Sequence, residues 1–205
     1  MRRVSRGRYI ALEGAEGCGK STQAAALASA LDAVLTRETG GTDIGLRIRE
    51  ILHDVDTTGL AARAEALLTA ADRAQHLAEV VEPALAAGRH VISDRSVYSA
   101  LAYQGYGREL DVDEVWRIND WAIAGRWPDL VVLLDAPADV LATRIAGREL
   151  DRFEREGEAF HRRVADGFRA MAAADPSHWI VLDAAGEVAD VTAAVLAAVD
   201  ERLAS

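Results

Sequence analysis

The segment Gly14-Ala15-Glu16-Gly17-Cys18-Gly19-Lys20-Ser21 decides the fold of this chain. Two spaced glycines followed by lysine and serine form the pattern of a phosphate-binding loop, and this loop lies between a predicted strand and a predicted helix. In such a loop, backbone N–H groups face the phosphates, the helix N-terminus adds positive charge, and the lysine reaches the β- and γ-phosphates. The segment therefore predicts a nucleoside triphosphate site, with Ser21 as a ligand of Mg²⁺.

Lys20 is the only lysine among the 23 basic residues of the chain, and all the others are arginines. A compact ammonium group fits a glycine-rich loop in which the planar guanidinium of arginine does not. The composition therefore supports the assignment of residues 14–22 as the phosphate-binding loop. It also disfavours a guanine-reading P-loop switch, which would need a second lysine in an Asn/Thr-Lys-x-Asp segment.

The length of 205 residues, half of them apolar, predicts a single domain over residues 1–205. The net charge of −10 argues against a nucleic-acid partner and favours small ligands. The one cysteine, Cys18, has no partner for a disulfide within the chain, and residues 1–8 lack the apolar region of a signal peptide. Apolar runs fall short of the roughly 20 residues that span a bilayer. We therefore expect a cytoplasmic protein without membrane segments.

Short apolar runs alternate with longer segments of helical periodicity, which predicts an α/β fold with a parallel sheet covered by helices on both faces. The expected strands are residues 9–12, 34–37, 90–93, 130–134 and 179–182. The expected helices are residues 21–31, 44–52, 60–87, 97–104, 112–124, 138–146, 158–173 and 188–203. In such folds the ligand lies beyond the carboxyl ends of the strands.

Two of these strand ends carry acidic residues. Asp94 and Arg95 follow the third strand, where the acid could hold Mg²⁺ through water and the arginine could bind a phosphate. A helix cap or a weak ion pair is the alternative for this pair. Asp135 follows the fourth strand and is either a second acid of the site or the N-cap of the next helix.

Residues 36–42 and 144–157 interrupt the pattern and are expected to be flaps beside the site. The second segment is rich in arginines and acids and is predicted to be a short mobile lid, with a solvated charged helix face as the alternative. Arg73 follows an apolar helix face closely, so it points either into the cleft or toward solvent.

Several motifs together resemble the bacterial thymidylate kinase family, a branch of the P-loop nucleoside monophosphate kinases. They occur in the order and spacing of that family, and they are residues 14–22, Arg37-Glu38, 40–42, Ile48-Arg49, 71–76, Asp94-Arg95, 102–105 and 149–154. The resemblance implies a three-layer fold with a five-stranded parallel sheet. It also implies phosphoryl transfer from ATP to dTMP with Mg²⁺, and a homodimer packed through helices. Leu77, Val80 and Val81 could supply that interface or belong to the core.

The resemblance also assigns roles on the dTMP side. The residues that it places on dTMP are Glu16, Arg37, Arg49, Thr69, Arg73, Arg95, Ser99, Tyr103 and Gln104. Glu16 would contact the 3′-hydroxyl, and three arginines would hold the phosphate. Arg73 and Gln104 would bind the polar edge of thymine, and Tyr103 would select deoxyribose.

On the ATP side the resemblance implicates the phosphate-binding loop and the lid. The residues that it places on ATP are Gly14, Ala15, Glu16, Gly17, Cys18, Gly19, Lys20, Ser21, Thr22, Arg144 and Arg148. Lys20, Asp94, Arg95 and Arg152 would be catalytic. Some members carry a catalytic arginine in the loop at the position of Gly17, so here the lid must supply it, through Arg152 with Arg148 as the substitute.

Three positions depart from the family pattern. Thr39 stands where the family usually has proline, which removes a fixed φ and a favoured site for a cis bond. Thr69 stands where many members stack a phenylalanine on thymine, and such stacking is worth about 1 kcal/mol. Ala100 replaces a small polar residue. These departures keep open a kinase that acts on another nucleoside monophosphate.

Overall fold

Five parallel strands form the centre of this computed structural model, which describes residues 6–204. Their bounds are β1 Tyr9–Glu13, β2 Val34–Arg37, β3 Val91–Asp94, β4 Leu130–Asp135 and β5 Trp179–Asp183. They lie in the order β2-β3-β1-β4-β5, and each neighbouring pair is parallel. The predicted strands and the predicted α/β fold are thus confirmed. Residues 1–5, on which the signal-peptide argument partly rests, lie outside the described part.

Helices fill the intervals between the strands, as the periodicity predicts. Their bounds are α1 Lys20–Ala30, α2 Asp43–His53, α3 Ala62–His76, α4 Glu82–Ala86, α5 Val97–Ala100, α6 Val112–Ala122, α7 Ala138–Ile145, α8 Glu158–Ala174 and α9 Val188–Ala204. Two π-helical segments, η1 Leu77–Val81 and η2 Leu101–Gly107, continue α3 and α5. The predicted helix 60–87 therefore changes hydrogen-bonding pattern along its length, and the helix predicted to end at residue 104 extends three residues further.

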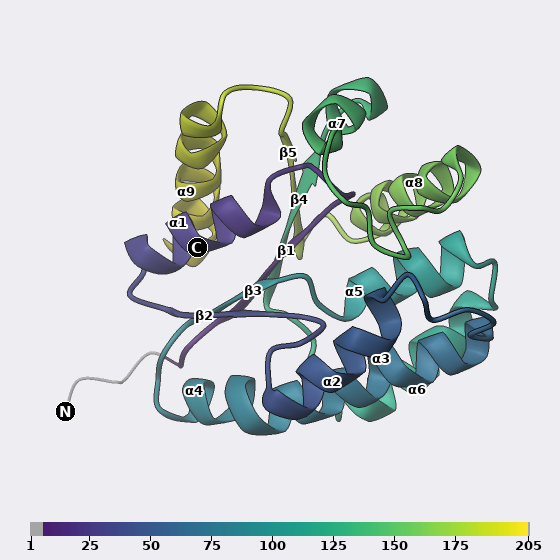
Figure 1. The fold of residues 1–205 in the computed structure, drawn as a ribbon. Coiled ribbons are helices and arrows are strands. Elements are labelled where there is room, and N and C mark those ends of the chain that lie inside the picture. Colours follow the sequence, from purple (N-terminus) through teal and green to yellow (C-terminus); the bar gives the residue numbers. More distant parts are fainter. Residues whose placement is uncertain (1–5, 205) are drawn as a thin grey trace.

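The sheet has helices on both faces, with α1 and α9 on one face and α8, α5 and η2 on the other (Figure 1). Alternating strand residues divide between these layers because successive side chains of a strand point to opposite faces. Ile10 and Val132 pack with α1 and α9, whereas Val131 and Leu133 pack against α8. The core therefore anchors each strand end, and the loops that follow these ends lie at one edge of the sheet.

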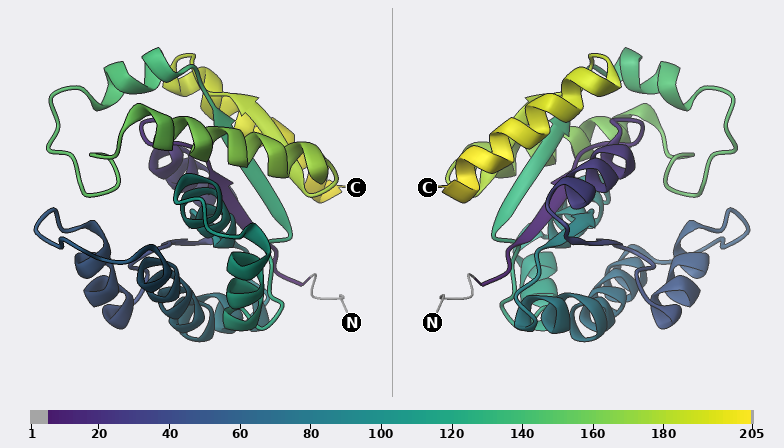
Figure 2. Two further views of the ribbon diagram at one scale, coloured as in Figure 1. Left: turned by 90° about the vertical axis from the view of Figure 1, so that its right-hand side faces the viewer. Right: turned by 90° about the vertical axis from the view of Figure 1, so that its left-hand side faces the viewer.

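The predicted lid, residues 144–157, consists of the last two residues of α7 and the connection between α7 and α8. Residues 146–157 contain neither helix nor strand, so the alternative of a charged helix face is wrong for this stretch. The connection projects from the same side of the molecule as the connection between α2 and α3 (Figure 2). The α7–α8 connection touches the end of α2, because the backbone N–H of Arg152 donates to the carbonyl oxygen of His53 at 3.1 Å. No helix within residues 6–204 is long and apolar enough to cross a bilayer.

Candidate functional site

The loop of residues 14–19 joins β1 to α1, as the sequence predicts. Gly14, Gly17 and Gly19 all have positive φ, a conformation that glycine adopts without steric cost. A Cβ atom on Gly14 would lie 2.4 Å from the carbonyl oxygen of Leu134, so no larger residue fits there. Lys20 folds over the loop, and its Nζ donates to the carbonyl oxygen of Ala15 at 2.8 Å. The loop therefore lies between a strand and a helix as predicted, and its role in phosphate binding stays a prediction.

Ser21 and Asp94 meet beside this loop. The Ser21 hydroxyl donates to Oδ2 of Asp94 at 2.5 Å, which places two hard oxygen ligands together at the carboxyl end of β3. Hydroxyl and carboxylate oxygens suit Mg²⁺, which usually keeps several waters or phosphate oxygens as further ligands. Within the described residues, no group of three or more His, Cys, Asp or Glu side chains could hold a metal. Ser21 and Asp94 thus offer two oxygen ligands of the kind that Mg²⁺ prefers.

Asp135, the other acid at a strand end, lies outside this arrangement. Its two carboxylate oxygens accept hydrogen bonds from Nε and Nη2 of Arg169 at 2.9 and 3.0 Å. The N-cap position of α7 is occupied by Pro137, so the N-cap alternative for Asp135 is wrong.

A cavity of about 1280 Å³, which we call the outer cavity, lies over the phosphate-binding loop. It is lined by Glu16, Gly17, Gly19, Lys20, Ser21, Thr22, Arg37, Glu38, Arg49, His53, Asp94, Arg95, Arg144, Arg148, Glu149, Asp151 and Glu154. The fold thus brings the loop, the end of β3 and two lid arginines to one space. Cys18 is instead buried in the core beneath the loop.

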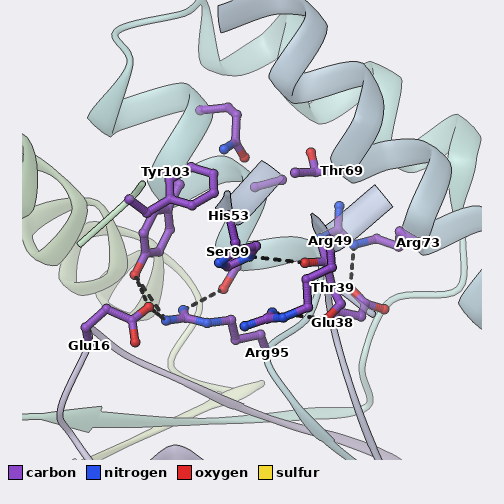
Figure 3. Close-up of a pocket in the computed structure, with 13 residues that line it drawn as sticks. Glu16, Glu38, Thr39, Arg49, His53, Thr69, Arg73, Arg95, Ser99 and Tyr103 are labelled. Atoms are coloured by element: carbon purple, nitrogen blue, oxygen red, sulfur yellow. Dashed lines mark hydrogen bonds and ion pairs between the residues drawn. The ribbon is translucent and has the colours of Figure 1, made fainter. Parts of the chain in front are cut away.

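A smaller cavity of about 440 Å³, the inner cavity, is drawn in Figure 3 and shares lining residues with the outer one. It is lined by Glu16, Glu38, Thr39, Arg49, His53, Thr69, Arg73, Arg95, Ser99, Ala100, Tyr103, Gln104 and Phe153. The residues that line both cavities are Glu16, Glu38, Arg49, His53 and Arg95. The two cavities therefore meet at a boundary that carries two arginines.

Arg95 lies at this boundary and is held on several sides. Its Nη1 donates to the Ser99 hydroxyl at 3.1 Å, and its Nη2 donates to the Tyr103 hydroxyl at 3.1 Å and pairs with Glu16 (Figure 3). Burial raises the pKa of the Glu16 carboxyl, but the charges of Arg95 and Lys20 outweigh it and lower the pKa to about 2. Glu16 is therefore ionised and can accept a hydrogen bond from a ligand hydroxyl.

Arg73 points into the molecule, so the alternative of a solvent-facing side chain is wrong. It is 2% exposed, and its Nε donates to Oε2 of Glu38 at 2.6 Å. Its Nη2 donates to the carbonyl oxygen of Ser96 at 3.1 Å, and its Nη1 donates to Asn119. These partners fix the guanidinium at the wall of the inner cavity.

The three departures from the family pattern all lie at the inner cavity. The peptide bond between Glu38 and Thr39 is cis, so the expected loss of a cis bond without proline does not occur. The Thr69 hydroxyl donates to the carbonyl oxygen of Ala66 at 2.8 Å, and Ala100 presents no polar group. Phe153 of the lid also lines the cavity and contacts Tyr103 edge to face, with ring centroids 5.8 Å apart. The inner cavity therefore has an aromatic wall, but the lid supplies it through Phe153, whereas the family pattern has the aromatic residue at position 69 on α3.

The lid arginines point in different directions. Arg144 donates to backbone carbonyl oxygens of residues 184–186, and Arg148 pairs with Glu154; both line the outer cavity. Arg152 lines neither cavity: its Nε donates to the carbonyl oxygen of Leu52 at 2.7 Å and its Nη2 to Glu65 at 2.6 Å. The catalytic role of Arg152 stays a prediction, and Arg148 is the candidate that lies beside the loop.

Sequence reasoning missed His53, Phe153 and Glu65. His53 ends α2, and its Nδ1 lies 2.7 Å from Asp151 of the lid. The sequence shows the arginines and acids of the lid as a cluster, but nothing in their spacing indicates which helix they contact.

Comparison with known proteins agrees with this geometry. The family model described as thymidylate kinase matches residues 12–195. A thymidylate kinase of Halothermothrix orenii is 47% identical over 87% of this chain and 89% of its own length. Those of Chromobacterium violaceum and Trichlorobacter lovleyi are each 45% identical, over 94% and 96% of this chain and 93% and 98% of their own lengths. The chain belongs to the thymidylate kinase family.

Proposed function

We propose that this chain transfers the γ-phosphoryl group of ATP to dTMP and so forms ADP and dTDP. The observation that carries the proposal is the junction of the two cavities at Glu16, Arg49 and Arg95. A donor on the phosphate-binding loop and an acceptor in the inner cavity would meet there, with arginines on both sides of the transferred group.

The outer cavity fits the triphosphate of ATP. The glycines of the loop and the start of α1 offer backbone N–H groups, and Lys20 lies within reach of the phosphates once its contact with Ala15 is released. Ser21 and Asp94 would hold Mg²⁺, which supplies positive charge to the phosphates when bound.

The phosphate of dTMP would lie at the boundary of the cavities. Arg37 lines the outer cavity, whereas Arg49 and Arg95 line both. Three guanidinium groups can bind the oxygens of one phosphate and hold it in line with the γ-phosphate. Transfer between two anions depends mainly on such positioning and charge neutralisation, because the transition state needs little covalent help.

The thymine would enter the inner cavity. Arg73 would donate to its O4, Gln104 would contact its polar edge, and Phe153 offers the apolar wall that Thr69 does not. The Tyr103 hydroxyl, bonded to Arg95 and Glu16, would lie against the sugar and select deoxyribose. Ser99, whose hydroxyl donates to Glu13 at 2.7 Å, would support the arginine.

A homodimer and a cytoplasmic location belong to the same proposal. Leu77 and Val81 pack in the core with Tyr9 and Val91, so they do not supply the interface. Leu67 on α3 and Trp121 on α6 are instead 56% and 84% exposed, and α3 and α6 are neighbours in contact. We place the interface on this apolar surface.

The proposal is tested by a coupled assay of ADP release across dTMP, dUMP, UMP, dGMP and CMP. We expect the highest kcat/KM with dTMP. A higher kcat/KM with UMP, CMP or dGMP would contradict the proposal and identify a kinase of another nucleoside monophosphate.

A further inference from the structure

Glu65, near the start of α3, is a buried charge that the proposed reaction does not use. Its side chain is 1% exposed, and Oε1 accepts hydrogen bonds from Nε2 of Gln104 at 2.9 Å and Nε of Arg108 at 3.1 Å. Its Oε2 accepts from Nη2 of Arg108 at 3.1 Å and from Nη2 of Arg152 at 2.6 Å. Helix α3, segment η2 and the lid thus meet at one carboxylate.

Glu65 is ionised in this setting. Burial raises the pKa of its carboxyl, but hydrogen bonds from Arg108, Gln104 and Arg152 outweigh burial and hold the pKa below its ordinary value. An ionised carboxylate has no proton to donate, so it can only accept hydrogen bonds.

The amide of Gln104 has two ends of opposite character, because its NH₂ group donates and its carbonyl oxygen accepts. Since Glu65 only accepts, the NH₂ end must face Glu65 and the carbonyl oxygen must point away from it. Within residues 6–204 no donor bonds to Oε1 of Gln104. Among the described residues, Oδ2 of Asp72 is the only side-chain polar atom that is fully buried and has no hydrogen-bond partner. Oε1 of Gln104 also has no partner, so it is not fully buried. The cavity that Gln104 lines is the inner one.

We infer that Glu65 is a positioning residue that fixes the Gln104 amide with its carbonyl oxygen toward the inner cavity, and so selects a base that offers an N–H donor. The inference rests on the proposed function and specifies how the site reads its base. Thymine and uracil carry a hydrogen on N3, whereas N3 of cytosine is an acceptor. A fixed carbonyl oxygen binds the first two bases and repels the third.

The test compares kcat/KM for dTMP, dUMP and dCMP in the wild type and in Glu65→Gln. The amide at position 65 in this variant can both donate and accept, so the Gln104 amide can rotate and exchange the positions of its oxygen and nitrogen. A change in the position of Arg152 would alter kcat/KM equally for all three substrates, because the same lid closes over each. The ratio of kcat/KM between two substrates is therefore unaffected by it. We expect the dTMP-to-dCMP ratio to fall about tenfold, as for the loss of one hydrogen bond. The dTMP-to-dUMP ratio should stay constant, because both bases carry the N3 hydrogen.

Glu156→Gln is the matched control. Oε1 of Glu156 accepts from Nη1 of Arg108 at 2.5 Å, so this variant also removes a carboxylate bound to Arg108, but it does not touch Gln104. We expect both ratios to match the wild type. A dTMP-to-dCMP ratio that is unchanged in folded Glu65→Gln, or that falls equally in Glu156→Gln, would overturn the inference. A wild-type enzyme without preference for dTMP would instead contradict the proposed function.

A second measurement decides the case in which Glu65→Gln does not fold. The side-chain amide of Gln104 in the wild-type protein can be assigned in a proton–nitrogen correlation spectrum by its absence in Gln104→Met. Because this amide donates to a buried carboxylate, its protons are expected to exchange slowly with solvent. Exchange as fast as that of an exposed amide would contradict the inference.

Discussion

Arg95 connects the two cavities at the scale of single residues. It follows β3 with a φ of 73°, in the left-handed region that is unfavourable for residues other than glycine and that clusters at functional sites. This backbone conformation accompanies a side chain that reaches Glu16, Ser99 and Tyr103. The position of Arg95 at a strand end was predictable from the sequence. Its partners were not all predictable, because they come from segments far apart in the chain.

Glu65 illustrates the same limit. Charged residues of helices are usually solvated, yet the fold buries Glu65 under Arg108, which follows η2, and Arg152 of the lid. Residues 71–76, which follow Glu65 on the same helix, could be recognised in the sequence because they form a contiguous motif. Roles carried by contiguous motifs can thus be predicted from this sequence, whereas roles created by packing cannot.

Asp72 supports a prediction about stability. It is fully buried, its Oδ1 accepts from the backbone N–H of Gly40 at 2.9 Å, and its Oδ2 has no partner. Burial raises the pKa of this carboxyl from 3.8 to about 6. The folded state therefore binds a proton more tightly than the unfolded state, and unfolding free energy is lost as pH rises between these two values.

Asp72→Asn removes this titration while its amide oxygen can still accept from Gly40. We expect the variant to match the wild type near pH 4 and to be more stable by roughly 2 kcal/mol near pH 7. Urea unfolding of both proteins at several pH values measures the difference. Parallel stability curves would show that Asp72 does not titrate in this range.

At the scale of elements, the strands followed from apolar runs and the helices from their periodicity, because both patterns are local. The π-helical segments η1 and η2 did not follow, since each spans only one or two turns, too few residues for a changed periodicity to be recognised in the sequence. Segment η2 carries Tyr103 and Gln104, and both line the inner cavity. The sequence predicted a helix at these two residues, but not that this helix is π-helical.

The predicted catalytic arginine, Arg152, lies in the lid. We expect Arg152→Ala to lower kcat by about 10³-fold, with a much smaller rise in the KM for ATP, because a transition-state arginine acts mainly during transfer. Steady-state kinetics with both substrates varied measures the two constants. Arg155→Ala is the control, since Arg155 is exposed and its Nε donates to the carbonyl oxygen of Leu150.

Arg148→Ala separates the two lid candidates. Full activity in Arg152→Ala together with a large loss of kcat in Arg148→Ala would transfer the catalytic role to Arg148, which already lines the outer cavity. Full activity in both variants would refute a catalytic lid.

At the scale of the whole molecule, the order of strands and helices was predictable because alternating elements permit few arrangements. The contact of the lid with α2 and α3 was not predictable, since it depends on where a long connection folds. The same holds for the surface of α3 and α6, where Leu67 and Trp121 are exposed.

This surface supports a prediction about assembly. Leu67→Glu would place a charge in the proposed dimer interface, so we expect a shift from dimer to monomer in sedimentation velocity experiments. Leu35→Glu is the control, because Leu35 is 51% exposed on the edge strand β2, which is not part of the proposed interface. A wild-type monomer, or a dimer that persists in Leu67→Glu but dissociates in Leu35→Glu, would refute this interface.

Phosphoryl transfer from ATP to dTMP is the central claim, and the fate of the γ-phosphoryl group tests it most directly. The wild-type protein is incubated with ATP labelled at the γ-phosphate, Mg²⁺ and dTMP, and the labelled products are separated. We predict that the label leaves ATP only when dTMP is present and is recovered in dTDP. Label recovered as inorganic phosphate, released equally without dTMP, would contradict the claim and identify an ATP hydrolase.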